Sequence, residues 1–252
     1  MRTNNPALSN AFTGQVARDT SDRMTVPGTI NRTGLLLLIA ATTALFAWNQ
    51  SVQTDGGYGD QPVFVPTAWL WIGMVGGLVT ALATIFKKTW APVSAPLYAA
   101  FEGLLLGALS GSFEVRFPGI VFQAMTGTFG TLGALLFAYR TGLIRATERF
   151  KLGVAAATGG IAIIYLVGLV MNLFGSHIPY IHESGGIGIG FSLLVVSVAA
   201  LNLILDFDFI ETGARGRAPK YMEWYSAFSL MVTLVWLYME MLRLISKVRS
   251  RD

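Results

Sequence analysis

The sequence predicts an all-α integral membrane protein, a bundle of seven transmembrane helices. Three observations predict this class. First, the 252 residues are 53% apolar and only 13% charged, whereas soluble domains carry about 25% charged residues. Second, the chain contains seven apolar runs, each long enough to cross a hydrocarbon core of about 30 Å. Third, lysines and arginines gather in the segments between alternate runs, where topology determinants lie.

The elements follow in a simple order. Residues 1–32 are polar and rich in Arg, Asp, Asn and Thr, and we expect them to form a disordered cytoplasmic tail. The membrane domain is expected to cover residues 33–246, and residues 247–252 form a basic C-terminal tail. The seven apolar runs are residues 33–48, 66–86, 91–113, 117–139, 152–174, 187–210 and 222–245. No small-residue cleavage pattern follows the first run, which favours a signal anchor over a cleaved signal peptide.

The distribution of basic residues predicts the orientation in the membrane. The tail and every second loop hold 13 lysines and arginines, whereas the loops between them hold one, Arg116. This asymmetry predicts a cytoplasmic N-terminus. Seven crossings then place the basic C-terminal tail outside. The alternative is that the last segment is broken or re-entrant and returns to the cytoplasm, so the sequence leaves the side of the C-terminus open.

Glycines recur four residues apart in several runs, as at Gly103 and Gly107. Small residues at this spacing let the backbones of neighbouring helices approach closely. We therefore expect seams of helix packing at these positions, and a permeation path lined by glycine backbone is the alternative.

Four acidic residues lie within apolar runs: Glu102, Asp206, Asp208 and Glu240. A charge at the centre of a span costs about 2.5–3.5 kcal/mol on insertion scales, so each residue needs a structural or functional reason. Glu102 follows Tyr98 by one helical turn. It is either a carboxyl satisfied by a hydrogen bond or part of an ion or proton path.

Asp206 and Asp208 point about 200° apart on a continuous helix and cannot share one site. Asn202 precedes Asp206 by four residues and shares its face. We therefore expect Asp206 to face the bundle interior and Asp208 to lie at the cytoplasmic interface, near Arg215 or Arg217.

Glu240 lies three residues before Arg243, which allows an ion pair within one helix. The other possibility is that Glu240 faces Asp206 across the bundle. Two carboxylates at contact distance share a proton and titrate as a pair. When deprotonated, the pair would also offer the hard oxygen ligands that Ca²⁺ prefers.

Other functional classes have little support in the sequence. The chain has no cysteine, which excludes disulfides and thiolate chemistry. Its net charge of +4 comes from loop residues, which argues against a nucleic-acid partner. Ser110 as a protease nucleophile, or zinc on His177, His182 and Glu183, would need histidines that lie in a loop predicted to be outside. We therefore expect no enzyme activity and no cofactor.

Three segments carry a resemblance to a known family. They are Glu-Gly-Leu-Leu-Leu-Gly at 102–107, Leu-Asn-Leu-Ile-Leu-Asp-Phe-Asp-Phe-Ile at 201–210, and Trp-Leu-Tyr-Met-Glu-Met-Leu-Arg-Leu-Ile at 236–245. With the seven-run layout, they make the chain similar to the Bax inhibitor-1, or transmembrane Bax inhibitor motif, family, and to its bacterial branch. The resemblance covers residues 30–247.

The resemblance implies six helices around a central seventh, and a pH-sensitive Ca²⁺ leak channel gated by acidic residues on the sixth and seventh spans. Asp206 and Glu240 match those two positions, with Glu240 in place of an aspartate, and Glu102 is a possible additional site on the ion path. The family's arginine on the second span has no counterpart in residues 66–86, and Arg243 is the candidate to replace it. A bacterial inner membrane is the implied location.

Two other functions remain open at this stage. The protein could be a non-conducting membrane protein that acts through interactions in stress regulation, with its acidic residues fixing helix packing. It could also be a proton-coupled transporter. The partners expected from the sequence are the lipid bilayer, Ca²⁺ and protons, while protein partners are unknown.

Overall fold

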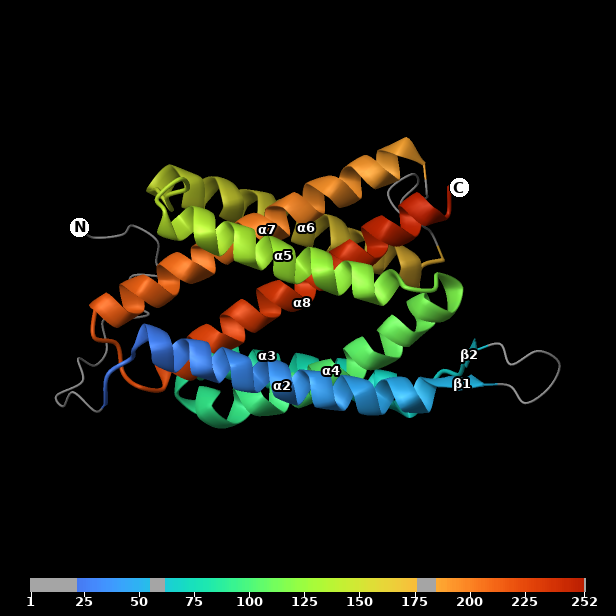
Figure 1. The fold of residues 1–252 in the computed structure, drawn as a ribbon, viewed down its shortest axis with the longest axis horizontal. Helices are drawn as coiled ribbons and strands as arrows, with labels where there is room; N and C mark the ends of the chain where they lie inside the picture. The colour runs from blue at the N-terminus through green and yellow to red at the C-terminus, as the bar shows by residue number, and fades with distance from the viewer. Residues whose placement is uncertain (1–21, 55–61, 176–184, 252) are drawn as a thin grey trace. The chain divides into compact units, whose positions relative to one another are not determined.

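The computed structural model describes residues 22–54, 62–175 and 185–251 (Figure 1). Seven long α-helices occupy most of these residues, and each is long and apolar enough to cross a membrane. This confirms the predicted all-α, seven-span class. The helices are α2 (Val26–Ser51), α3 (Ala68–Phe86), α4 (Ala91–Arg116), α5 (Ile120–Arg140), α6 (Glu148–Leu173), α7 (Gly186–Arg215) and α8 (Met222–Arg249). A single 3₁₀ turn, η2 (Lys88–Trp90), joins α3 to α4.

Helix α2 begins at Val26, seven residues before the apolar run that predicts it. Thr25 is the N-cap, and its hydroxyl accepts a hydrogen bond from the Gly28 N–H at 3.0 Å. Pro27 lies in the first turn, where its missing N–H costs nothing. The predicted polar tail therefore ends before Val26, because capping and proline placement start this helix ahead of its apolar part.

The loop after α2 holds a short hairpin that the hydropathy pattern does not predict. Strands β1 (Val52–Thr54) and β2 (Pro62–Phe64) pair antiparallel, with Val52 opposite Phe64. Ser51 and Thr67 hydroxyls lie 3.0 Å apart beside it. Three residues per strand are too few to signal a strand by alternation.

The last segment is one continuous helix. Helix α8 runs unbroken for 28 residues from Met222 to Arg249, about 42 Å at 1.5 Å per residue. The alternative of a broken final helix is therefore wrong for α8.

The chain divides into two compact units. The first unit comprises Met1–Val115 and Asp208–Met231, and the second comprises Arg116–Phe207 and Val232–Asp252.

Glycines bring α2, α3 and α4 together within the first unit. A Cβ added to Gly103 would overlap Thr43 and Ala40 of α2, and one on Gly107 would overlap Ala44. A Cβ on Gly73 of α3 would lie 2.6 Å from the Leu105 nitrogen of α4. The predicted packing seams are thus present in this unit. By contrast, Gly130, Gly133, Gly159 and Gly160 have no atom of the described residues within 4 Å of such a Cβ.

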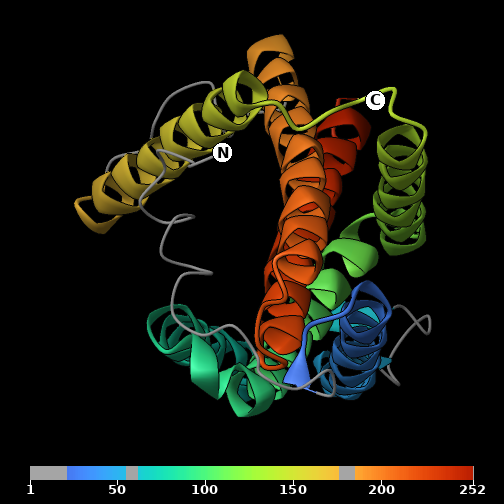
Figure 2. The same ribbon diagram turned by 90° about the vertical axis from the view of Figure 1, so that its left-hand side faces the viewer.

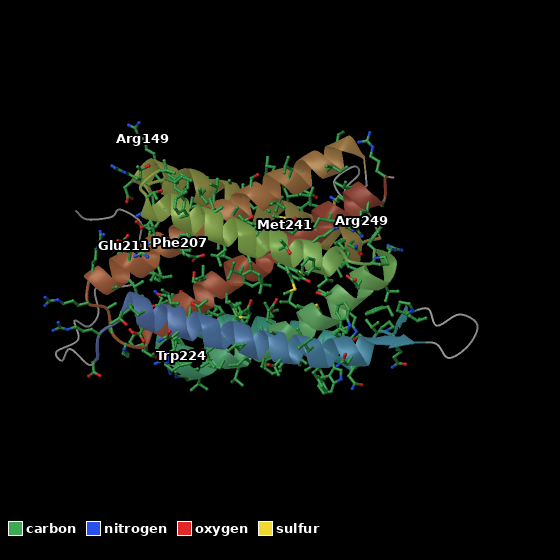
Figure 3. The ribbon with its side chains drawn as sticks, in the orientation of Figure 1. Arg149, Phe207, Glu211, Trp224, Met241 and Arg249 are labelled. Carbon is green, nitrogen blue, oxygen red and sulfur yellow. The ribbon has the colours of Figure 1, made fainter. Side chains whose placement is uncertain are left out.

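The second unit contains α5, α6, the first part of α7 and the end of α8. Ile161 of α6 and Val195 and Val198 of α7 form its buried cluster, and Trp236 of α8 packs against them. In this unit α7 and α8 lie side by side (Figure 2). Met241 of α8, labelled in Figure 3, lies against Gly127 of α5, whose added Cβ would be 3.4 Å from the sulfur.

Candidate functional site

Three carboxylates in the helices that could span a membrane are buried, and others, Glu102 and Asp208 among them, are half-buried. Asp206 is 7% exposed, Glu240 1% and Glu223 0%, while Glu102 is half-buried. Because burying an ionised carboxylate is costly without partners, the partners of each residue show what it can do.

Glu240 is neutralised by contacts within the second unit. Its Oε1 accepts a hydrogen bond from the Tyr165 hydroxyl of α6 at 2.9 Å and forms an ion pair with Arg243 Nη1 at 2.8 Å. The Arg243 guanidinium also lies over the Tyr165 ring, 5.4 Å from its centroid. The ion pair within one helix, predicted as one possibility for Glu240, is therefore present.

A second basic residue of α8, Lys247, lies one turn beyond Arg243. The Lys247 ammonium donates to the Gly188 carbonyl at 3.1 Å and to the Ser192 hydroxyl at 2.8 Å. These contacts join the end of α8 to the first turns of α7. Glu240 is thus followed by two cations that hold α8 against α6 and α7.

Contacts with α5 show how far apart Glu240 and Asp206 lie along the helix axes, because a neighbour of each residue packs against α5. Gly127 of α5 lies against Met241, the neighbour of Glu240, whereas Tyr139 of α5 packs on Phe207, the neighbour of Asp206, with ring centroids 5.8 Å apart. Twelve residues of helix separate Gly127 from Tyr139, which is about 18 Å. Phe207 and Met241 are both labelled in Figure 3.

Contacts between α7 and α8 also place Glu240 and Asp206 at different levels. Trp236 packs on the cluster that contains Val195 and Val198, and Lys247 reaches Gly188 and Ser192. Glu240 lies between Trp236 and Lys247, so it is level with α7 residues no later than Val198. Asp206 lies eight residues, or about 12 Å, beyond Val198.

The contacts within the second unit place Asp206 and Glu240 at different levels along α7 and α8, and they do not support the predicted proton-sharing pair or a Ca²⁺ site that both would ligate. The physical reason is the register of an antiparallel helix pair. Helix α7 ends at Arg215 and α8 begins at Met222. Asp206 lies nine residues before the end of α7, whereas Glu240 lies 18 residues after the start of α8, so the two differ in their distance from the connecting loop.

Asp206 faces inward and Asp208 less so. Asp206 is buried and Asp208 is half-buried. Asn202, expected to share the face of Asp206, donates from Nδ2 to the Thr158 hydroxyl of α6 at 2.8 Å and to the Val198 carbonyl at 2.9 Å. Its amide thus ties α7 to α6. Arg215, a suggested partner of Asp208, forms an ion pair with Glu211 at 2.5 Å.

Glu102 lies in the glycine-rich part of the first unit. It forms a side-chain hydrogen bond with Tyr98, one turn earlier on α4, as its spacing predicts. Its Oε2 lies 3.1 Å from the position that a Cβ on Gly77 of α3 would take. Glycine at this position leaves room for the carboxyl between two helices.

Glu223, the acidic residue in the first turn of α8, is a further buried carboxylate that the sequence pattern does not indicate. Its Oε1 accepts hydrogen bonds from the Thr25 N–H at 3.0 Å and the Thr25 hydroxyl at 2.9 Å, and Lys220 pairs with it at 3.0 Å. An acidic residue in a first helical turn is ordinary, so its pattern gave no signal. Lys220, three residues earlier, was the clue available.

No group of three or more His, Cys, Asp or Glu side chains that could hold a metal ion occurs in the described part of the chain. The residues of the zinc alternative, His177, His182 and Glu183, lie outside the described residues. Ser110, the hypothetical protease nucleophile, is buried at 5% exposure on α4.

The fold and these carboxylates define a class: a multi-pass α-helical membrane protein with acidic side chains held inside its spans. The comparison with family models then gives the family. The model described as Bax inhibitor 1 like matches residues 5–250, nearly the whole chain, so the chain belongs to this family. No curated protein matches the chain.

Proposed function

We propose that the protein is a pH-sensitive Ca²⁺ leak channel of the Bax inhibitor-1 type, and that Asp206 carries its pH sensitivity. Asp206 supports this best, because it is a carboxyl only 7% exposed within a span. Ionisable residues inside membrane spans are expensive and mark ion or proton paths. Membership of the family agrees with the proposal.

The other two carboxylates receive different roles in this proposal. Glu102, half-buried beside glycine-rich α3, is a second candidate for the ion path. Glu240 is assigned a structural role, because Arg243 and Tyr165 already occupy its Oε1. The gate therefore rests on the protonation of one carboxyl and needs no pair. The proposed activity is transport without catalysis.

We further propose a bacterial inner membrane with the N-terminus in the cytoplasm. The support is the alternation of basic residues between helices, 13 against one. Arg140 ends α5 and Arg149 lies in the first turn of α6, on the same predicted side. Such an excess of Lys and Arg marks cytoplasmic loops.

Purified protein in liposomes tests the function by Ca²⁺ flux measured from acidic to mildly alkaline pH. We expect flux that changes with pH, and Asp206→Asn to flatten that change because the amide keeps the shape but cannot ionise. Asp208→Asn is the matched control, and Glu240→Gln a second one. Both should leave the pH profile largely intact.

Absence of Ca²⁺ flux at every pH would overturn the proposal and favour a non-conducting interaction protein. Uptake of a small solute that follows an imposed pH gradient would instead identify a proton-coupled transporter. Equal effects of Asp206→Asn and Asp208→Asn would show that the pH sensor is assigned to the wrong carboxyl.

A further inference from the structure

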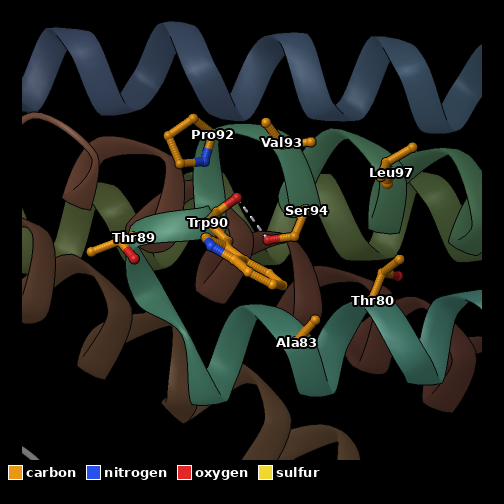
Figure 4. Close-up of a pocket in the computed structure, with 8 residues that line it drawn as sticks. All are labelled: Thr80, Ala83, Thr89, Trp90, Pro92, Val93, Ser94 and Leu97. Atoms are coloured by element: carbon orange, nitrogen blue, oxygen red, sulfur yellow. Dashed lines mark hydrogen bonds between the residues drawn. The ribbon is translucent and has the colours of Figure 1, made fainter.

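The corner between α3 and α4 in the first unit contains an apolar groove (Figure 4). Its walls include Ala83 of α3, Trp90 of η2, and Val93 and Leu97 of α4. The side chains on the α4 side are open to the surroundings, with Val93 68% and Leu97 48% exposed. Since both helices are candidate spans, this surface is suited to contact with hydrocarbon.

The polar groups beneath the groove are satisfied by one another. The Thr84 hydroxyl donates to the Ser94 hydroxyl at 2.7 Å, and Ser94 donates to the Trp90 carbonyl at 3.0 Å. Thr84 is fully buried and Ser94 is 6% exposed. A ligand in the groove thus meets an apolar surface and finds few hydrogen-bonding groups.

Two lysines follow α3 in the chain, and the first of them lies against a wall of the groove. The Lys87 ammonium lies 4.1 Å from the centroid of the Trp90 ring, and Trp90 itself lines the groove. The Lys88 ammonium lies 5.3 Å from the centroid of the Tyr225 ring. Neither lysine forms a salt bridge with a described residue, and residues 80–97 contain no acidic residue.

An apolar groove next to two cations matches an amphiphile with a negative head. Trp and Tyr are typical of the level at which lipid head groups lie, and each Lys near an anionic surface adds to its attraction. A free anion would use the lysines but not the groove, and a neutral lipid would use the groove but not the lysines.

We propose that this corner binds an anionic phospholipid, with one acyl chain along Val93 and Leu97 and the phosphate at Lys87 and Lys88. The Trp90 ring joins the two parts of the site, since it lines the groove and carries the Lys87 ammonium on its face. This site lies in the first unit and is independent of the proposed Ca²⁺ leak.

Native mass spectrometry of the full chain in detergent, titrated with phosphatidylglycerol or phosphatidylcholine, tests the site. We expect the wild type to retain phosphatidylglycerol preferentially. The double variant Lys87→Gln/Lys88→Gln should lower that preference roughly tenfold, because it removes two cations near the head group. Arg145→Gln/Arg149→Gln is the matched control, since it removes two exposed cations elsewhere and should leave the preference unchanged.

A second variant tests the groove separately. Val93→Trp fills the groove without changing charge, and we expect it to reduce retention of phosphatidylglycerol while both lysines remain. Glycerol phosphate, which has the head-group chemistry but no acyl chain, should not displace the lipid. Unchanged preference in the lysine variant, an equal loss in the arginine control, or displacement by glycerol phosphate would overturn the proposal.

Discussion

Helix α8 carries two buried glutamates, and the carboxylate of each is stabilised by a different set of partners. Glu223 at its start is 0% exposed and Glu240 near its end is 1% exposed. Each pairs with a basic residue three positions away, Lys220 for the first and Arg243 for the second. Each also accepts a hydroxyl hydrogen bond, from Thr25 or from Tyr165.

The two glutamates differ in the hydrogen-bond donors that they have besides the basic residue. Glu223 receives two bonds from Thr25, and the chain before Thr25 is fixed to the α7–α8 loop. The Met24 N–H donates to the Ala218 carbonyl at 2.7 Å, and the Lys220 N–H donates to the Asp22 carbonyl at 2.8 Å. Glu240 has one hydroxyl from another span and its arginine. We infer that Glu240 depends more on its cation than Glu223 does.

Removing the cation beside Glu240 should produce the largest effect, and removing the one beside Glu223 a much smaller one. Arg243→Met leaves the Glu240 carboxylate buried with the Tyr165 hydroxyl as its remaining hydrogen-bond donor among the described residues, and we expect a loss of about 3 kcal/mol in the free energy of unfolding. Lys220→Met leaves both Thr25 donors in place, and we expect about 1 kcal/mol. Unfolding in mixed micelles by sodium dodecyl sulfate titration measures both. Equal losses, or a larger one for Lys220→Met, would contradict the inference that Glu240 depends more on its cation than Glu223 does.

A glycine next to Glu223 provides the second test. A Cβ on Gly28 would overlap the Glu223 carboxylate, which three donors hold in place. Gly28→Ala should therefore push the carboxylate away from Thr25 and cost about 2 kcal/mol, as overpacking does. Gly34→Ala is the control on the same helix, because no described atom lies within 4 Å of its added Cβ.

We expect the Gly34→Ala control to be neutral or stabilising by up to about 1 kcal/mol, from helix propensity alone. The same unfolding titration reports both variants. If Gly28→Ala were as harmless as Gly34→Ala, the contact between α2 and the start of α8 would contribute little to stability.

The sequence was sufficient to predict the spans but not the partners of the buried carboxylates. Hydropathy depends on the composition of about 20 neighbouring residues, so all seven helices were found. The Glu240–Arg243 pair was one of the two alternatives that the sequence offered for Glu240, because the two residues are three apart on one helix. The role of Glu223 was invisible, because Thr25 lies 198 residues away in a segment that looks like a polar tail.

The predicted pairing of Asp206 with Glu240 has a different origin. Both residues lie in segments that resemble the family's pattern, and two carboxyl groups can share a proton, so the sequence favoured a pair. Two helices joined by a short loop must pair residues at similar distances from that loop. Asp206 lies nine residues before the end of α7, while Glu240 lies 18 residues after the start of α8. Counting from the loop was possible from the sequence and would have separated them.

The hydroxyl donors should give small effects that compare the two glutamates directly. Tyr165→Phe removes one hydrogen bond to Glu240 but keeps the aromatic ring on which Arg243 lies, and we expect a loss of about 1 kcal/mol. Thr25→Val removes the hydroxyl that both donates to Glu223 and caps α2 by accepting from Gly28. Because it ends two interactions, Thr25→Val should cost about 1.5 kcal/mol.

A double-mutant cycle distinguishes the two ends of α8 further. Tyr165 and Arg243 donate to the same oxygen of Glu240, so Tyr165→Phe should cost more in the Arg243→Met background than in the wild type. In the Lys220→Met background, Thr25→Val still leaves the Thr25 N–H on the Glu223 carboxylate, so its cost should rise less. Additive losses at Glu240, measured by the same unfolding titration, would mean that its buried carboxylate is stabilised by something other than these two donors.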